Sequence, residues 1–481
     1  MCRVPTILSV LCALAAAAGM VVLAVSLPGK DPRGLLCGIG LPLLGMIAWT
    51  YSDIPPVVWA GQAVLGAAAV AIARPWRSWS HLPHRGGFWL AVPVWFGGAV
   101  SPLLLGDTTI AGQRLVYGGF ALAVAAAVLT GPAPRRRPPG DPGTGAAAGF
   151  LICLAILLVS GAPDVLAGEH WTVGGEWGHA MSDRFWGGPG LGYHPNFIGL
   201  TAVMVAMRIG PDDRFTPWQR WGSVAVPAGI LPLVGSRTAL MVAFVAAGCF
   251  AVVHLGRNRA SGRRLRRWWP DRARRHTLAV AVAPTLAVTL VFGMSGGVDL
   301  LVRNRYGTAE TDSGVLNRLL SGRPDIWAAM LTDYAHDSPV EWLFGDAGNA
   351  RGVHRTITDP DDPRYTDQAQ HTADNAVVGM LYRGGVAGTG FLAVGLWLLI
   401  RRVWRRAGGP APPTWTIVVV AALLVGGFTE DEIAGTTPAW LLLCCAEIAT
   451  IGNRVTPPHT ASIPPKTTRS SPNGRPLTVT D

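Results

Sequence analysis

The sequence predicts an all-α, polytopic membrane protein of about 12–13 transmembrane helices, with one large extracytoplasmic loop. Of its 481 residues, 50% are hydrophobic and 14% are charged, whereas soluble domains carry roughly 25% charged residues. The 60 glycines suit helices that pack closely in a bilayer. Apolar runs long enough to cross a bilayer, roughly 17–25 residues, recur along the chain. We therefore expect a multi-pass protein of the cell membrane.

Thirteen apolar runs are candidate spans. They cover residues 5–27, 34–51, 54–73, 88–105, 113–131, 146–167, 191–210, 220–235, 237–255, 277–300, 374–400, 415–432 and 436–452. The chain divides into N-terminal transmembrane helices (1–145), a main transmembrane domain (146–452) and a Pro/Thr/Ser-rich tail (453–481) that we expect to be disordered. The main domain carries the one large polar insert, residues 301–373.

Arginine-rich segments predict the orientation. Residues 257–275 form the densest basic run and are cytoplasmic by the positive-inside rule. With alternating helices, the same choice places four more basic segments inside: 74–85, 135–137, 208–220 and 401–406. It puts the loop 301–373 outside. Because the net charge of +11 falls in these short runs between apolar segments, we expect the bilayer as a partner and no nucleic acid.

The loop 301–373 contains a predicted amphipathic helix. Apolar residues recur there at three- and four-residue steps: Leu316, Leu319, Leu320, Ile326, Trp327, Met330, Leu331 and Tyr334. Such a helix lies on the membrane surface or caps a cavity between spans. Since catalytic residues gather on loops carried by a rigid scaffold, we expect this loop to contribute to the functional site. The alternative is a connector without chemistry.

Arginines on the predicted outer face are candidates for binding a diphosphate. Arg237 in GSRTAL and Arg323 in SGRPDIW each lie beside a small residue at a predicted helix start, and Arg318 lies nearby in VLNRLL. A guanidinium group stays ionised and bonds two oxygens at once. Ser236 could cap the helix that begins at Arg237 and so present backbone amides to an anion. Anchoring to lipid headgroups is the alternative for these arginines.

Two residues at the end of the loop are candidates for a general base. His371 and Asp374 lie three residues apart, on one face if a helix has begun there. Imidazole titrates near neutrality, whereas an aspartate would need desolvation to become a stronger base. Asp374 could instead be the N-cap of the next span. The acidic run 358–367 lacks the spacing of a calcium loop, so we expect no metal.

An ordered series of short motifs resembles the O-antigen ligase/polymerase family. The motifs are GYHPNFIGL (192–200), GSRTAL (235–240), SGRPDIW (321–327), FGDAGN (344–349) and DNAVVGMLYRGGVAG (374–388). Members of this family are integral-membrane glycosyltransferases of the GT-C type. The resemblance implies that the chain takes a glycan from an undecaprenyl-diphosphate carrier and joins it to a glycan or lipid-linked acceptor outside the membrane. It also implies an inverting reaction without metal or cofactor.

The resemblance suggests roles for particular residues. Asp374 and His371 are the catalytic candidates, and the substrate-binding candidates are Arg237, Arg323, Arg318, His194, Asn196, Ser236 and Asn375. Family ligases carry a histidine directly before the position of Asn375, where this chain has Asp374. We therefore prefer a polymerase-like activity over a ligase. A chain-length regulator or a flippase would be a partner. The alternative function is a transporter or flippase of lipid-linked glycans.

Overall fold

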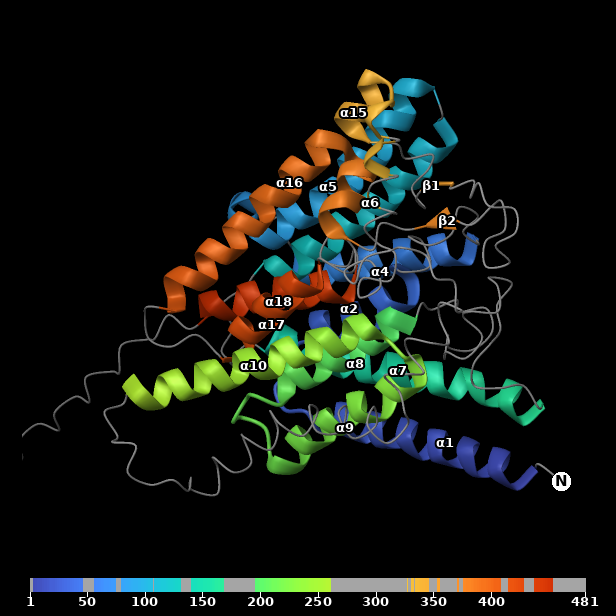
Figure 1. Cartoon of the computed structure of the whole chain (residues 1–481), viewed down its shortest axis with the longest axis vertical. Coiled ribbons are helices and arrows are strands. Elements are labelled where there is room, and N and C mark those ends of the chain that lie inside the picture. The colour runs from blue at the N-terminus through green and yellow to red at the C-terminus, as the bar shows by residue number, and fades with distance from the viewer. Residues whose placement is uncertain are drawn as a thin grey trace, which may run out of the picture.

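The computed structural model describes the chain in segments. They are residues 3–45, 56–74, 79–106, 108–130, 140–167, 195–260, 327, 330–332, 334–345, 353–354, 370–371, 375–407, 414–427 and 437–452. Within these ranges the chain is almost entirely helical (Figure 1). The strands found there are β1 (Val353–His354) and β2 (Gln370–His371), which pair antiparallel. The predicted all-α class is confirmed for the described residues.

The described helices follow the apolar runs of the sequence. They are α1 (Arg3–Ser26), α2 (Pro32–Gly40) continued by the π-helix η1 (Leu41–Gly45), α4 (Pro56–Ala73), the 3-10 helix η3 (Trp79–His84), α5 (Gly86–Leu105), α6 (Thr108–Leu129), α7 (Pro142–Ala167), α8 (Pro195–Ile209), α9 (Pro217–Val234), α10 (Arg237–Ala260), α15 (Pro339–Phe344), α16 (Ala376–Ala407), α17 (Thr414–Gly426) and α18 (Pro438–Gly452). Every predicted span overlaps one of them except 277–300, which lies outside the described residues, as does the tail 453–481.

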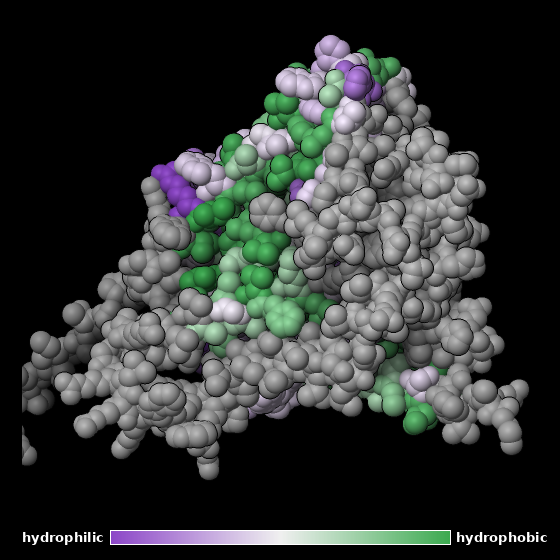
Figure 2. Space-filling model, viewed as in Figure 1, coloured by the Kyte–Doolittle hydropathy of each residue, from purple (hydrophilic) through white to green (hydrophobic). Residues whose placement is uncertain are grey.

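Three of the described helices are long and apolar enough to cross a membrane. Their apolar stretches are Ile7–Ser26, Pro142–Ala162 and Ala376–Val403, and shorter apolar helices of 10–17 residues accompany them. Figure 2 shows that hydrophobic side chains dominate the described surface on one face. Large exposed apolar faces of this kind need an apolar surrounding. The chain therefore has the helices of a membrane protein, and the number of 12–13 spans stays a prediction.

One hydrophobic core joins the early and late helices. It contains residues of α1, α2, α7 and α18, among others, and α1 and α2 both pack against α7. The predicted N-terminal segment 1–145 thus shares its core with the domain 146–452.

Two contacts join helix ends that the predicted topology places on the same side of the membrane. Arg33 of α2 donates from Nη1 to the carbonyl oxygen of Thr130, just after α6, at 2.6 Å. Gln219 at the start of α9 donates from Nε2 to the carbonyl oxygen of Ser26 at the end of α1, at 2.9 Å. These contacts agree with helices that alternate in direction. Which side faces the cytoplasm stays a prediction.

A buried cluster of ion pairs joins the predicted inner ends of α7 and α8. Arg208 of α8 is fully buried; it donates to Asp212 at 2.9 Å and also pairs with Asp141, the residue before α7. Arg214 pairs with both aspartates, at 2.7 Å each. The guanidinium carbon of Arg208 lies 4.5 Å from the ring centroid of Trp415 in α17. The cluster therefore ties together α7, α8, α17 and the turn after α8.

The cluster predicts a loss of stability in acid. Burial raises the pKa of Asp141, but the charges of Arg208 and Arg214 outweigh it and hold that pKa below the ordinary value. The pKa of Asp212 is lowered in the same way, against the effect of burial, by the hydrogen bond from Arg214 and the charge of Arg208. A carboxyl group whose pKa is lower in the folded than in the unfolded protein stabilises the folded state. This stabilisation is complete when the pH is above the pKa of the unfolded state, about 3.9, and it is lost as the pH falls through the pKa of the folded state.

We expect the unfolding temperature in detergent to be nearly level from pH 7 to about pH 5 and to fall below about pH 4. Asp141→Asn should flatten this fall, because it removes one of the two carboxylates that must be protonated. Asp213→Asn is the control, since the Asp213 side chain is 89% exposed. If the unfolding temperature of Asp141→Asn falls as steeply in acid as that of the wild-type protein, the cluster is not the cause of the acid sensitivity.

The predicted span 374–400 coincides with a helix of membrane-spanning length, Ala376–Val403, but this helix, α16, is broken at Gly385. This glycine has φ 61° and ψ −163°, which separates two helical segments, 376–384 and 386–407. A Cβ atom at Gly385 would lie 2.4 Å from the carbonyl carbon of Leu343 in α15, and a Cβ atom at Gly345 would lie 2.2 Å from the carbonyl carbon of Arg383. Helix α15 therefore crosses α16 at backbone contact (Figure 1).

Gly385→Ala is expected to destabilise the protein by roughly 1–3 kcal/mol, because alanine tolerates neither the positive φ nor the closeness of Leu343. Gly390→Ala in the same helix is the matched control, since a Cβ atom there meets no other atom within 4 Å. Thermal unfolding in detergent measures both variants. Equal unfolding temperatures would show that the break does not need glycine.

Candidate functional site

The predicted outer ends of α8 and α10 touch closely. A Cβ atom at Gly199 of α8 would lie 3.2 Å from Cβ of Ser236 and 2.9 Å from Cβ of Ala239 in α10. Asn196, in the first turn of α8, is buried, and Ser236 is fully buried. The motifs GYHPNFIGL and GSRTAL therefore meet, although about 40 residues of sequence separate them. Only a glycine at 199 allows this approach.

Ser236 caps α10 as the sequence predicts. The backbone N–H of Ala239 donates to Oγ of Ser236 at 3.1 Å, and the preceding Gly235 ends α9 with a positive φ of 55°. This tight turn makes Arg237 the first residue of α10. A helix start of this kind presents backbone dipoles that favour an anion.

Asn375, and not Asp374, caps α16. Oδ1 of Asn375 accepts hydrogen bonds from the backbone N–H groups of Val377 and Val378, at 2.9 and 3.0 Å. Asn375 is buried, and the helix begins at the next residue. The alternative interpretation of Asp374 as the N-cap is therefore wrong.

The end of α17 links the starts of α16 and α10. The backbone N–H of Ala376 donates to the carbonyl oxygen of Gly427 at 2.8 Å. A Cβ atom at the neighbouring Gly426 would lie 2.8 Å from Cγ2 of Val242, in the second turn of α10. The N-terminal ends of α8, α10 and α16 thus lie around one region of the predicted outer face, and three of the five motifs contribute to it. We call this region the outer site.

His371 does not share a helical face with Asp374. It belongs to β2, where its backbone is opposite Val353, and α16 begins only at Ala376. The condition for a shared face, a helix that has begun at His371, is therefore not met. The strand pairing instead brings His371 beside the segment that follows the FGDAGN motif.

Several predicted site residues lie outside the described residues. These are Asp374, His194, Arg318 and Arg323. For Arg237 and His371 the structure gives the backbone position, at the start of α10 and in β2. Their assigned roles stay predictions.

The described residues within 330–345, in the middle of the loop 301–373, pack against α16. Met330 and Tyr334, both predicted for the apolar face of an amphipathic helix, are buried with Tyr382 of α16. The hydroxyl of Tyr334 donates to the carbonyl oxygen of Trp342 in α15, and Leu331 is exposed. In its described residues, then, this stretch is helical with one buried side.

The sequence reasoning did not select Arg383. This arginine of α16 is buried, next to the crossing with α15. A charged residue within an apolar span is rare and marks a functional candidate, and that signal was present in the segment LYRGG. Within the described ranges, His, Cys, Asp and Glu side chains form no group of three that could bind a metal.

Comparison of the sequence with family models and with curated proteins identified no relative. No model of a known protein family matches the chain, and no curated protein matches its sequence. The resemblance to the O-antigen ligase/polymerase family therefore depends on the motif series itself.

Proposed function

We propose that this chain is a membrane glycosyltransferase that polymerises or transfers a glycan from an undecaprenyl-diphosphate donor in the synthesis of a surface polysaccharide. It would act on the outer face of the cell membrane as a multi-pass protein. A polymerase-like reaction is preferred over a ligase, because the histidine slot of the ligase motif holds Asp374.

The observation that carries the proposal is the meeting of motifs at the outer site. The starts of α8, α10 and α16 are far apart in sequence, and each lies in a segment that resembles the family. Contacts of Gly199 with Ser236, and of Ala376 with Gly427, gather these helix starts. Helix N-termini are suited to bind an anionic group such as a diphosphate, because their backbone N–H groups and dipoles favour negative charge.

The proposed reaction joins an acceptor hydroxyl to the anomeric carbon of the donor. The acceptor oxygen attacks from the face opposite the diphosphate, the bond from the anomeric carbon to the diphosphate oxygen breaks, and its electron pair leaves with the diphosphate. Asp374 or His371 takes the proton of the hydroxyl. Arg237 and Arg323 stabilise the negative charge that develops on the leaving diphosphate.

One observation favours the alternative of a transporter. Glu447 of α18 is fully buried, accepts from the backbone N–H groups of Gly86 and Gly87 at 3.0 and 2.9 Å, and pairs with Arg402 of α16. Charged residues inside spans are common along transport paths, and Glu447 lies inside the predicted span 436–452. This pair lies at the predicted inner ends of its helices, away from the outer site.

An assay with a defined lipid-linked oligosaccharide separates the two functions. The purified protein is reconstituted with the donor, and the products are resolved by gel electrophoresis. A ladder indicates a polymerase, and a single larger product in the presence of an acceptor indicates a ligase. Unchanged donor that moves from one leaflet to the other would contradict the proposal and support transport. Protein inactivated by heat is the control.

A further inference from the structure

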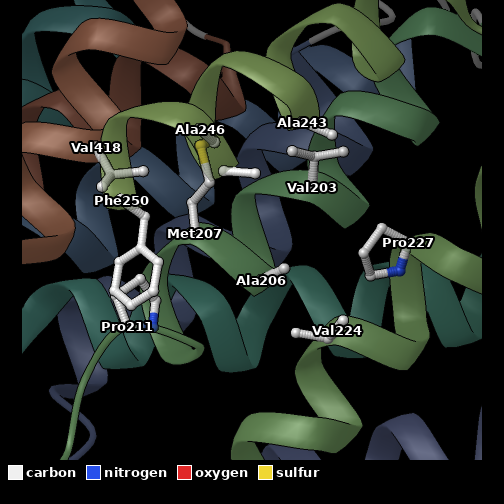
Figure 3. Close-up of a pocket in the computed structure, with 11 residues that line it drawn as sticks. Val203, Ala206, Met207, Pro211, Val224, Pro227, Ala243, Ala246, Phe250 and Val418 are labelled. Carbon is white, nitrogen blue, oxygen red and sulfur yellow. The ribbon is translucent and has the colours of Figure 1, made fainter. Parts of the chain in front are cut away.

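An apolar groove opens between α9 and α10. Val203 and Met207 of α8, Pro227 of α9, and Ala243 and Phe250 of α10 are among its lining residues (Figure 3). The groove has a cavity volume of about 50 Å³, and every lining side chain is apolar. Because none of these side chains can donate or accept a hydrogen bond, the groove suits a hydrocarbon chain and not a sugar or a headgroup.

The groove extends toward the predicted cytoplasmic end of the helices, where α10 is basic. Arg257 and Arg259 follow the lining residue Phe250 by seven and nine positions in the same helix. At about 1.5 Å per residue, this places the arginines roughly 10–14 Å farther along the helix axis. Half of a hydrocarbon core is about 15 Å thick, so a chain in the groove would have its headgroup near these arginines.

A second arginine position lies at the same end of the groove. Arg220 of α9 is one helical turn before the lining residue Val224. It is 8% exposed, and its Nε donates to the carbonyl oxygen of Gly210 at 2.8 Å, next to the lining residue Pro211. Its Nη1 pairs with Asp213 at 2.9 Å, whereas its Nη2 is buried and has no hydrogen-bond partner among the described residues. A buried N–H group without an acceptor is unfavourable, and a phosphate oxygen is an acceptor that guanidinium groups bind well.

We propose that the groove binds one acyl chain of an anionic phospholipid of the inner leaflet, with its phosphate at the arginines of α9 and α10. The apolar lining selects the chain, and the arginines select an anionic headgroup through charge attraction. This site lies toward the opposite end of the helices from the outer site and does not depend on the proposed transfer reaction.

Lipid retention tests the proposal. The purified protein is freed of lipid in a mild detergent and incubated with phosphatidylglycerol or phosphatidylcholine of identical acyl chains, and native mass spectrometry then measures bound lipid. We expect the wild-type protein to retain phosphatidylglycerol about tenfold better. Combining Ala243→Leu with Ala247→Leu fills the groove and should reduce this retention about tenfold. Ala393→Leu, at an exposed position of α16, is the matched control and should retain the lipid as the wild-type protein does.

A second variant tests whether lipid binding requires the positive charges of α10. Combining Arg257→Gln with Arg259→Gln should remove the preference and leave weak, equal retention of both lipids. Equal retention of the two lipids by the wild-type protein would overturn the proposal, as would full retention by the filled variant. Efficient disulfide formation between Ala243→Cys and Leu286→Cys, in a protein without its native cysteines, would also overturn it, because the predicted span 277–300 would then occupy the groove.

Discussion

Arg237→Lys is expected to reduce glycan transfer by about 10- to 100-fold, because one charge-assisted hydrogen bond, worth roughly 1.5–3 kcal/mol, is lost. A lysine keeps the charge but cannot bond two phosphate oxygens in the fork geometry of a guanidinium group. Arg237 is the first residue of α10, directly after the capping Ser236. The lysine does not disturb this helix start, since lysine is a good helix former.

Arg323→Lys should have a similar effect if both arginines bind the diphosphate. Arg305→Lys is the control, because Arg305 lies in the same predicted outer loop but in none of the five motifs, and we expect it to anchor the loop at the lipid headgroups. Initial rates with the lipid-linked donor are measured at equal amounts of folded protein, as judged by size-exclusion chromatography. Wild-type rates in both Arg237→Lys and Arg323→Lys would exclude an arginine clamp from the mechanism.

The helices could be predicted because lipid imposes a strict rule on the backbone. Every N–H and C=O group in a bilayer must be paired within the segment, so an apolar run of sufficient length predicts a helix. The boundary between α9 and α10 could be predicted as well. Gly235 adopts a positive φ and Ser236 caps the next helix, and both are local preferences of these residue types.

The features that could not be predicted depend on contacts between distant parts of the chain. The break at Gly385 is fixed by the backbone of Leu343, 42 residues earlier. A glycine within an apolar run predicts no break by itself, because glycines are common in membrane helices. Likewise, His371 is in a strand because its backbone pairs with Val353. Helical spacing counted along the sequence gave no indication of that pairing.

The same contacts explain how much of the outer site could be predicted. Asn196, Ser236 and Asn375 were selected from separate motifs, and the contacts of Gly199, Gly426 and Gly427 gather the helix starts that carry them. The choice between a cap and a base at residue 374 was open in the sequence, because both roles suit an aspartate before a span. The hydrogen bonds of Asn375 to Val377 and Val378 decide which residue is the cap.

Asp374→Asn is therefore expected to reduce transfer by about 10²–10⁴-fold, the usual effect of removing a general base. Asparagine keeps the size and polarity of the side chain but cannot accept the proton of the acceptor hydroxyl. Since Asn375 supplies the cap of α16, the substitution should leave the unfolding temperature unchanged. Asn375→Ala serves as the reference for a lost cap, which costs about 1 kcal/mol of stability.

His371→Gln separates the two candidate bases. If Asp374 takes the proton and His371 only assists it, His371→Gln should lower the rate less than Asp374→Asn does. The dependence of the rate on pH should then change in the histidine variant near neutrality, where imidazole titrates. Near-normal transfer by Asp374→Asn would show that Asp374 is not the base. The proton acceptor would then be His371, which lies in β2 beside Val353, or His194, directly before the start of α8.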